Sequence, residues 1–359
     1  IIEIAFDDRT FNQLRNPDKA LQYIKSKITD KKMYFILLDE VQMMDEFVDV
    51  LNSLLHIRNA NVYVTGSNSH FLSKDVATEF RGRGDEIHLF PLSFSEFYSA
   101  GWKSKDECWK EYYTFGGLPQ ILSLEGKKKK EDYLISLNES VYFKDIIERH
   151  NVRNKEEFKE LMAVIASAIG SPCSPSKLSN TFMSVKKTNI DKKTISKYLS
   201  YMEDAFIIAR ARRYDVKGKK YINTLSKFYF QDIGLRNALL EFRQNEESHI
   251  MENVIYNELC SRGFRVDVGL VEDRSQNSRK NLEVDFVVNS GDMRYYIQSA
   301  LSIAEKAKKE QETASFKNIQ DSFKRIIIVR EDIAPYHDEN GYLIMGLFDF
   351  LLNKNALPC

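Results

Sequence analysis

The chain has 359 residues, 43% of them hydrophobic and 29% charged, and 52 basic residues balance 52 acidic residues. This composition excludes a disordered chain, and the length predicts two or three domains. The longest apolar runs are too short to cross a bilayer, the start shows no signal-peptide pattern, and four scattered cysteines indicate neither a zinc site nor a disulfide framework. We therefore expect a soluble, cytoplasmic protein with no membrane partner.

The zero net charge hides an uneven distribution along the chain. Residues 1–100 hold 11 Lys and Arg against 15 Asp and Glu, a balance of −4. Residues 172–230 hold 13 Lys and Arg against 4 Asp and Glu, a balance of +9. The middle of the chain therefore carries a local basic field, which favours a partner rich in negative charge.

Strands and helices alternate through the first part of the chain. Apolar runs predict strands at 1–6, 33–38 and 61–65, and amphipathic spacing predicts helices at 17–27 and 45–55. The first helix has a cap at Asn16 and a proline at its first position. Such alternation predicts a parallel sheet flanked by helices, with ligands bound beyond the carboxyl ends of the strands.

Two adjacent carboxylates, Asp39 and Glu40, end the second predicted strand. At the carboxyl end of a buried parallel strand, one acid can hold Mg²⁺, and its neighbour can orient or deprotonate an attacking water. The alternative is a core strand that ends in a surface turn with two solvated acids. The segment alone does not separate these interpretations.

Two polar segments follow the acid pair. The next predicted strand ends in Gly66-Ser67-Asn68, and if the two strands are neighbours, Ser67 or Asn68 would lie beside the acids and contact a γ-phosphate or its water. Arg81 and Arg83 then stand in a glycine-flanked loop, from which an arginine can reach a phosphate. An ordinary Gly-Ser-Asn turn and a solvated loop arginine are the alternatives.

Four segments together resemble a prokaryotic family of AAA-type P-loop ATPases. They read ILLDEVQ, VYVTGSNSHFLS, FRGRGDEIHLFPLSFSEF and FGGLPQIL, in the order that the family has them. Members carry a winged-helix segment and a restriction-endonuclease-like domain after the ATPase. The resemblance implies that Asp39 and Glu40 are the Walker B acids, with Asp39 serving Mg²⁺ and Glu40 activating water, and that Gly116-Gly117-Leu118-Pro119 is a turn in the helical lid.

The same resemblance assigns the residues that follow the Walker B strand. Asn68, or else Ser67, matches sensor 1, and Arg83 matches the arginine finger better than Arg81. The implied cofactors are ATP and Mg²⁺. An arginine finger that acts in a neighbouring subunit would imply a homo-oligomer.

One family motif, the phosphate-binding GxxxxGK[ST], does not occur in these 359 residues. The pairs Gly126-Lys127 and Gly218-Lys219 are preceded at the required position by Ile121 and Arg213. In the family this loop precedes the strand that matches the start of this chain, so we expect it upstream of Ile1. Without the backbone cradle and its lysine, we expect this polypeptide neither to bind nor to hydrolyse ATP appreciably.

The basic middle of the chain predicts a winged helix-turn-helix. Helices are expected at 158–169, 174–180 and 191–202, followed by strands at 206–214 and 221–230. On the last helix and at the tip of the hairpin, the lysines expected to contact DNA are Lys192, Lys193, Lys197, Lys217, Lys219 and Lys220. Winged helices also serve in dimerisation and protein docking, which is the alternative.

The C-terminal part resembles the restriction-endonuclease-like fold, whose active form needs an acid, a second acid and then Glu/Asp-x-Lys. Glu252 and Asp285 fit the first two positions. The third reads Gln298-Ser299-Ala300, so an amide replaces the acid and alanine replaces the lysine. Because an uncharged amide is a poor Mg²⁺ ligand, we expect a degenerate site without Mg²⁺-dependent nuclease activity.

The expected fold class is α/β, with a truncated AAA-type P-loop domain, a winged-helix segment and a restriction-endonuclease-like α/β domain. The boundaries are an ATPase core at 1–100, a helical lid and linker at 101–150, the winged helix at 151–235 and the nuclease-like domain at 236–359. We expect an ATPase, complete once its P-loop is supplied, coupled to a half that binds DNA or a partner. The alternative is a non-catalytic nucleic-acid or protein-interaction module built on degenerate enzyme folds.

Overall fold

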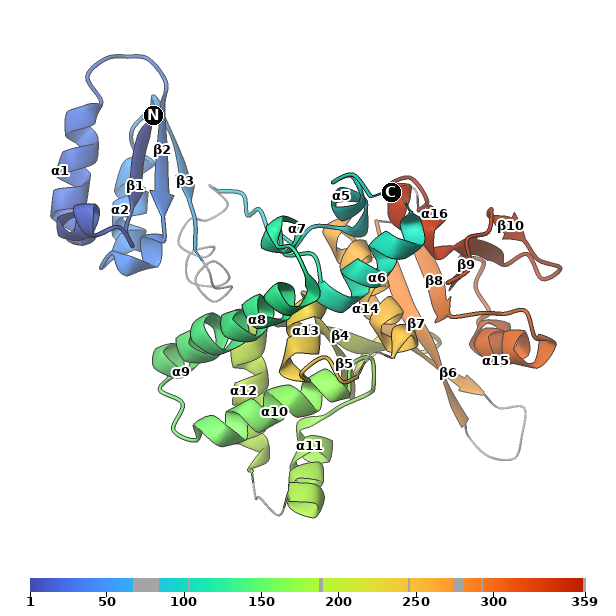
Figure 1. Ribbon diagram of the computed structural model, residues 1–359. Helices are drawn as coiled ribbons and strands as arrows, with labels where there is room; N and C mark the ends of the chain where they lie inside the picture. Colours follow the sequence, from blue (N-terminus) through green and yellow to red (C-terminus); the bar gives the residue numbers. More distant parts are fainter. Residues whose placement is uncertain are drawn as a thin grey trace. The chain divides into compact units, whose positions relative to one another are not determined.

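The computed structural model describes residues 1–66, 84–102, 104–186, 190–244, 246–273, 280–291 and 293–357. The chain divides into two compact units, shown in Figure 1. The first contains Ile1–His88 together with Asp204–Phe206, and the second contains Leu89–Glu203 together with Ile207–Cys359. Each unit has its own sheet.

The elements of the first unit alternate as the apolar pattern predicts. In chain order they are β1 (Ile2–Ala5), the 3-10 helix η1 (Arg9–Arg15), α1 (Pro17–Lys27), β2 (Tyr34–Asp39), the 3-10 helix η2 (Val41–Met43), α2 (Phe47–Leu54) and β3 (Ala60–Val64). Asn16 caps α1 by accepting a hydrogen bond from the Lys19 amide at 3.1 Å. The predicted start of this helix is confirmed.

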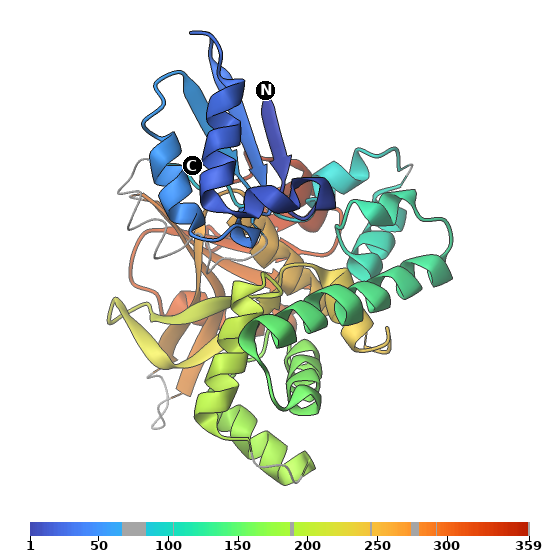
Figure 2. The same ribbon diagram turned by 90° about the vertical axis from the view of Figure 1, so that its left-hand side faces the viewer.

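The first sheet is parallel in the order β1-β2-β3. Its core lies between the sheet and helices α1 and α2, where Ile36 and Leu38 are buried (Figure 2). The expectation of a buried second strand holds on one face only. Phe35 is 41% exposed and stacks on Tyr63, which is 52% exposed, because both helices pack on the opposite face.

The second unit begins with helices that pack around the end of its sheet. They are α5 (Phe94–Tyr98), α6 (Lys105–Phe115), α7 (Gln120–Ser123), α8 (Lys127–Leu137), the π-helix η3 (Asn138–Phe143) and α9 (Lys144–His150). The segment before them, 85–90, has no regular structure, and Ile87 and Leu89 are exposed. This segment pairs with no strand among the described residues.

The basic middle forms the elements expected of it. They are α10 (Lys155–Ser167), α11 (Pro175–Thr181), the π-helix η4 (Phe182–Lys186), α12 (Lys192–Asp204), β4 (Ile208–Asp215) and β5 (Lys220–Phe230). Ser174 caps α11 through the Lys177 amide at 3.1 Å, and Asp191 accepts from the Lys193 amide at 3.0 Å. These caps are the ones that the sequence indicates.

The rest of the second unit is mixed α/β. Its elements are α13 (Ile233–Leu239), α14 (Glu247–Ser261), β6 (Arg265–Asp273), β7 (Lys280–Ser290), β8 (Met293–Ala300), α15 (Lys306–Lys317), β9 (Lys324–Val329), β10 (Tyr336–His337), β11 (Leu343–Gly346) and α16 (Leu347–Leu352). Its sheet has eight strands in the order β10-β11-β9-β8-β7-β6-β4-β5. The β4–β5 hairpin (yellow-green to yellow in Figure 2) therefore belongs to the same sheet as the strands that follow it in the chain. A domain boundary was predicted between residues 235 and 236, and this sheet includes strands from both sides of it.

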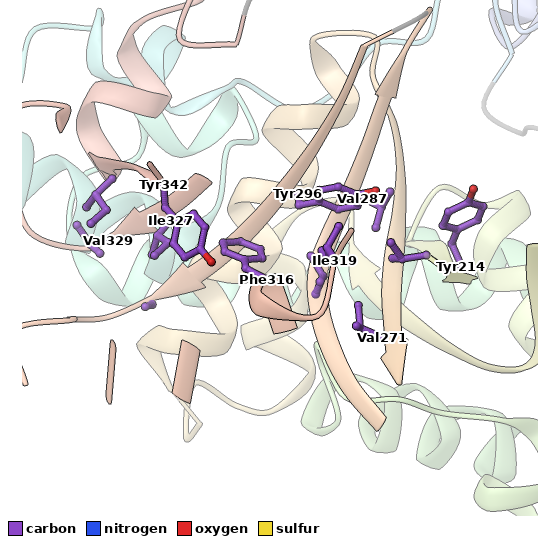
Figure 3. Packing of buried hydrophobic residues seen from close by; sticks show 13 residues of the cluster. Tyr214, Val271, Val287, Tyr296, Phe316, Ile319, Ile327, Val329 and Tyr342 are labelled. Atoms are coloured by element: carbon purple, nitrogen blue, oxygen red, sulfur yellow. The ribbon is translucent and has the colours of Figure 1, made fainter. Parts of the chain in front are cut away.

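Helices cover both faces of this sheet. Tyr296 belongs to a buried cluster with Phe316 of α15 and with Ile319 (Figure 3). Its neighbour Tyr295 packs against Phe264, just after α14. Because successive side chains of a strand point to opposite faces, α14 and α15 lie on opposite sides of the central strands.

The segment Phe115–Pro119, which reads FGGLP, was expected to form a turn in the helical lid. Its backbone contacts the buried carboxylate of Asp232. The Asp232 carboxylate accepts hydrogen bonds from the Gly117 amide at 2.7 Å and, as the cap of α13, from the Leu235 amide at 3.0 Å. Gly116 has φ +78°, and a Cβ there would collide with this carboxylate. Burial raises the pKa of Asp232 to about 6, although the amide donors oppose the shift.

Among the described residues, no helix combines the length and the hydropathy that crossing a membrane would need.

Candidate functional site

The acid pair Asp39-Glu40 lies at the carboxyl edge of the first sheet. Parallel register places Ala5 opposite Asp39 and Leu38 opposite Val64, so the three strands end at the same edge. β2 and β3 are neighbouring strands, which is the condition set for Ser67 or Asn68 to lie beside the acids. The ends of the two strands bring Asp39 and Thr65 together.

Thr65, directly after β3, connects the two strand ends. Its hydroxyl donates a short hydrogen bond to Oδ1 of Asp39 and accepts one from the backbone amide of Glu40 at 3.1 Å. Its own backbone continues the pairing, with its amide donating to the Leu38 carbonyl at 2.9 Å. One side chain thus orients the first acid and holds the backbone of the second.

Glu40 has a backbone conformation that non-glycine residues seldom adopt, with φ 51° and ψ 45°. Such residues cost about 1–3 kcal/mol and are found mostly at functional sites. The Gln42 amide donates a short hydrogen bond to Oε2 of Glu40. The described hydrogen bonds therefore reach one oxygen of each carboxylate, Oδ1 of Asp39 and Oε2 of Glu40, and their donors are uncharged.

This arrangement fits part of a magnesium–nucleotide site. Carboxylate oxygens held by uncharged donors at an exposed strand end suit Mg²⁺ and an ordered water. The 359 residues contain no GxxxxGK[ST], so this chain supplies the acids without the cradle that would hold the phosphates. The other predicted residues of the site, Ser67, Asn68, Arg81 and Arg83, lie outside the described residues.

Thr65 is a site residue that was not predicted from the sequence. Its signal was present, since a hydroxyl at the end of the strand next to an Asp-Glu pair can bond across the sheet edge. The residues assigned to sensor 1 come two and three positions later, and their expected roles remain predictions.

A second cluster of acids lies in the other unit, around the ammonium of Lys227 on β5. Its Nζ is 2.8 Å from Oε1 of Glu252, 2.7 Å from Oε1 of Glu283 and 3.7 Å from Oδ1 of Asp285. The lysine side chain is 3% exposed. The structure therefore brings the two predicted acids, Glu252 and Asp285, to one cation that was not predicted from the sequence.

Backbone and side-chain donors hold the same acids from other sides. Tyr229 Oη donates to Oε1 of Glu252 at 2.6 Å, and the Ser299 amide donates to Oδ2 of Asp285 at 2.9 Å. The Asp285 amide donates to Oε1 of Gln298 at 3.1 Å. Gln298 therefore lies beside Asp285, with its amide oxygen bonded to the neighbouring strand, and its assignment to a degenerate nuclease site stays a prediction.

Burial controls the proton affinity of this cluster. It raises the pKa of Asp285 to about 8, with repulsion from Glu252 adding to the effect and Lys227 opposing it. Burial alone would lower the pKa of Lys227, but the carboxylates, Glu252 first, raise it above its usual value. Burial and the neighbouring acids thus favour the protonated form of Asp285, and the carboxylates favour the charged form of Lys227.

Lys227 reaches an acid of β7, although β4 and β6 lie between β5 and β7 in the strand order. The sheet is irregular beside the lysine. β4 pairs with β6 only over Arg213–Asp215, and its register with β5 shifts between Arg212 and Arg213. Lys227 pairs with Ala211, on the other side of this shift.

The basic residues expected to contact DNA are exposed. On α12, Lys192, Lys193 and Lys197 face outward, while Ile195 and Leu199 are buried. Met202 completes the buried stripe, as the helical spacing predicted. The β4–β5 turn exposes the lysines predicted at its tip, namely Lys217, Lys219 and Lys220.

Comparisons with known proteins bear on both units. Residues 1–98 match a family model described as an AAA domain, and residues 106–246 match one described as a domain of unknown function (DUF8612). An uncharacterized protein of Haemophilus influenzae is 30% identical over 362 residues, covering 98% of this chain and 86% of its own. The chain belongs to the family of that protein.

Uncharacterized protein MJ1544 of Methanocaldococcus jannaschii is also 30% identical, over 352 residues that cover 94% of this chain and 76% of its own. The match at residues 1–98 supports membership of the AAA-type P-loop ATPases for the family's first unit. A crystal structure of protein VC1899 from Vibrio cholerae aligns with 96% of this chain and 78% of its own at 10% identity. Its TM-score is 0.25, so it supports no conclusion about the fold.

Proposed function

We propose that Asp39 and Glu40 are the metal-binding and water-activating acids of an ATPase site. The hydroxyl of Thr65, which bonds both residues across the edge of two parallel strands, carries this proposal. The match of residues 1–98 to an AAA domain supports it independently. Mg²⁺ supplies charge neutralisation to the phosphates of ATP when both are bound.

Each acid has its own role in this site. Asp39, fixed at Oδ1 by Thr65, contacts Mg²⁺ or its waters. Glu40, fixed at Oε2 by Gln42 and at its amide by Thr65, orients the attacking water and accepts its proton. Asn68 or Ser67 contacts the γ-phosphate, and Arg83, or else Arg81, stabilises developing charge in a neighbouring copy of the chain.

Two measurements test the ATPase proposal. A nucleotide titration should give no micromolar affinity for this 359-residue chain, and affinity should appear in a longer protein that contains a GxxxxGK[ST] loop. In that protein, Glu40→Gln should bind ATP and fail to hydrolyse it. Glu3→Gln, at an exposed carboxylate on β1, is the matched control and should hydrolyse ATP normally. Full hydrolysis by Glu40→Gln would refute the assigned role.

We further propose that the second unit binds DNA through the exposed lysines of α12 and the β4–β5 turn, in the manner of a winged helix, with the nucleotide state of the first unit controlling that binding. The balance of +9 over residues 172–230 supports this, because phosphate neutralisation dominates non-specific affinity. The rest of this unit serves as a restriction-endonuclease-like scaffold without nuclease activity.

The salt dependence of DNA binding tests this surface. Replacing Lys192, Lys193 and Lys197 together by Glu should reduce the slope of log K against log salt by roughly one for each phosphate that is no longer neutralised. The matched control replaces Lys127, Lys128 and Lys129, which are exposed on α8, and should leave the slope unchanged. A flat slope in the unmodified protein would favour the alternative.

The alternative is a non-catalytic interaction module built on degenerate enzyme folds. If a longer natural form also lacks the GxxxxGK[ST] loop and binds no nucleotide, this second function replaces the first.

A further inference from the structure

The cluster around Lys227 has the composition of a cation site in which the cation is already present. An ammonium has three donor hydrogens, and here it faces three carboxylates, those of Glu252, Glu283 and Asp285. Divalent metal ions use the same carboxylate ligands, at about 2.0–2.6 Å. The distances from Nζ, 2.7 to 3.7 Å, are those of ion pairs.

The carboxylates are anchored by contacts other than the lysine. Tyr229 donates a hydrogen bond to Oε1 of Glu252. Gly170 packs close to the other oxygen, since a Cβ added to Gly170 would lie 3.2 Å from Oε2 of Glu252. The Ser299 amide bonds Oδ2 of Asp285. Glu252 and Asp285 therefore keep hydrogen-bond donors of their own when the ammonium is removed.

The lysine position also has limited access to solvent. Lys227 is 3% exposed, and the carboxylate side chains of Glu252 and Asp285 are 11% and 13% exposed. Glu283 is more open, at 28%, and borders a small hollow with Arg213 and Ser226. Glu283 is therefore the acid of this cluster that is most accessible to solvent. Among the described residues, no group of three or more His, Cys, Asp or Glu is arranged to hold a metal ion.

We propose that Lys227 is the resident cation of this carboxylate site, that it excludes divalent metal ions from the second unit, and that removing its ammonium opens a site for Mn²⁺ or Mg²⁺. The second unit consequently folds and acts without metal. The proposal does not depend on the ATPase site in the other unit.

Mn²⁺ binding, measured by the electron paramagnetic resonance signal of the free ion, tests the proposal. The full chain carrying Asp39→Asn and Glu40→Gln serves as the starting protein, so that the first unit's acids do not contribute. Lys227→Met should add one Mn²⁺ site. This site should bind Mn²⁺ roughly tenfold or more tightly than any site of the starting protein. A further Glu283→Gln should weaken that site by a similar factor.

A matched control uses another lysine that bridges carboxylates. Lys309 lies 2.9 Å from Asp338 and 3.2 Å from Glu339, with a more exposed side chain and only two acids. Lys309→Met should add no Mn²⁺ site. A folded Lys227→Met protein that binds no additional Mn²⁺ would overturn the proposal, as would a new site of equal affinity in the Lys309→Met protein.

The starting protein gives a second test that does not require the Lys227 variant to fold. With Lys227 intact, it should bind no Mn²⁺ that is lost on Asp285→Ala, and it should show no Mg²⁺-dependent DNA cleavage. Binding or cleavage that Asp285→Ala abolishes would mean that a metal enters beside the lysine, and the proposal would be wrong. Absence of both supports it.

Discussion

The two acid clusters of this protein use the same side chains in opposite environments. Asp39 and Glu40 lie at the open end of a sheet and are held by uncharged donors, from Thr65 and Gln42. The acids around Lys227 are largely buried and are neutralised by the chain's own ammonium. Carboxylates of the first kind can take a cation from solution, whereas those of the second kind already have one. The environment of an acid, more than its sequence motif, therefore decides what it can bind.

The largest effect that tests this comparison is expected from Lys227→Met. Removing one partner of a buried ion pair leaves the others uncompensated, at a cost of about 3–5 kcal/mol. We expect the free energy of unfolding of the second unit to fall by this amount in urea titrations at pH 7 without metal. Lys309 has a more exposed side chain, at 22% against 3% for Lys227, and it faces two acids rather than three, so Lys309→Met should cost less. Equal losses in the two variants would contradict the contrast between the buried lysine and the partly exposed one.

A third acid, Asp232, is buried with no ion pair among the described residues, and its pH dependence extends the comparison. Its pKa is raised from 3.8 to about 6 by burial, so the folded state binds the proton more tightly than the unfolded state. The stabilisation is complete below pH 3.8 and is lost as pH rises through about 6. By about 1.4 kcal/mol per pKa unit, the loss amounts to about 3 kcal/mol.

Asp232→Asn removes this titration. The difference in unfolding free energy between the unmodified protein and the variant should therefore shrink between pH 4 and pH 7, as measured by urea titrations across that range. The comparison cancels other groups that titrate in the same window, including Asp285. A difference that stays constant with pH would show that Asp232 is not the group responsible.

Gly116→Ala tests how closely the backbone approaches Asp232. The added Cβ collides with the carboxylate, and overpacking of this kind costs about 1–3 kcal/mol beyond the strain of a positive φ. Gly126 also has a positive φ, of +84°, but its Cβ would meet nothing within 4 Å. Gly126→Ala should therefore cost only the strain, about 1 kcal/mol. Thermal unfolding of the two variants measures the difference in their stability. Equal unfolding midpoints would show that the contact with Asp232 does not add to the cost of Gly116→Ala.

The smallest effect is expected at the open site, from Thr65→Val. The hydroxyl that this change removes bonds Asp39 and the Glu40 amide at an exposed strand end, so the stability of the first unit should fall by about 1 kcal/mol or less. Thr65→Ser keeps the hydroxyl and should recover most of that stability in the same urea titration. A decrease as large as that of Lys227→Met would mean that the first site is a structural network as well.

Local features of the fold could be predicted from the sequence because their causes are local. Asn16 and Pro17 set the start of α1, Ser174 sets the start of α11, and the spacing of Ile195 and Leu199 sets the buried face of α12. The end of β2 at the acid pair follows from its apolar run in the same way. These signals lie within one or two helical turns of the residues that they control.

The features that could not be predicted depend on contacts between distant segments. Lys227 meets acids of α14 and β7, which follow it in the chain and are brought to it only by the fold. The contact of Gly116 with Asp232 spans more than a hundred residues. The exposure of Phe35 likewise follows from which face the helices cover, which the sequence of β2 does not contain.

Paramagnetic broadening by Mn²⁺ of backbone amide resonances tests the contrast between the two sites most directly. In a form of the protein that carries a GxxxxGK[ST] loop, with ATP present, we predict broadening at Asp39, Glu40 and Thr65. The amides of Lys227 and Asp285 should remain sharp. Broadening at Asp285 with none at Asp39 would contradict the assignment of an open acid site in the first unit and a lysine-filled one in the second.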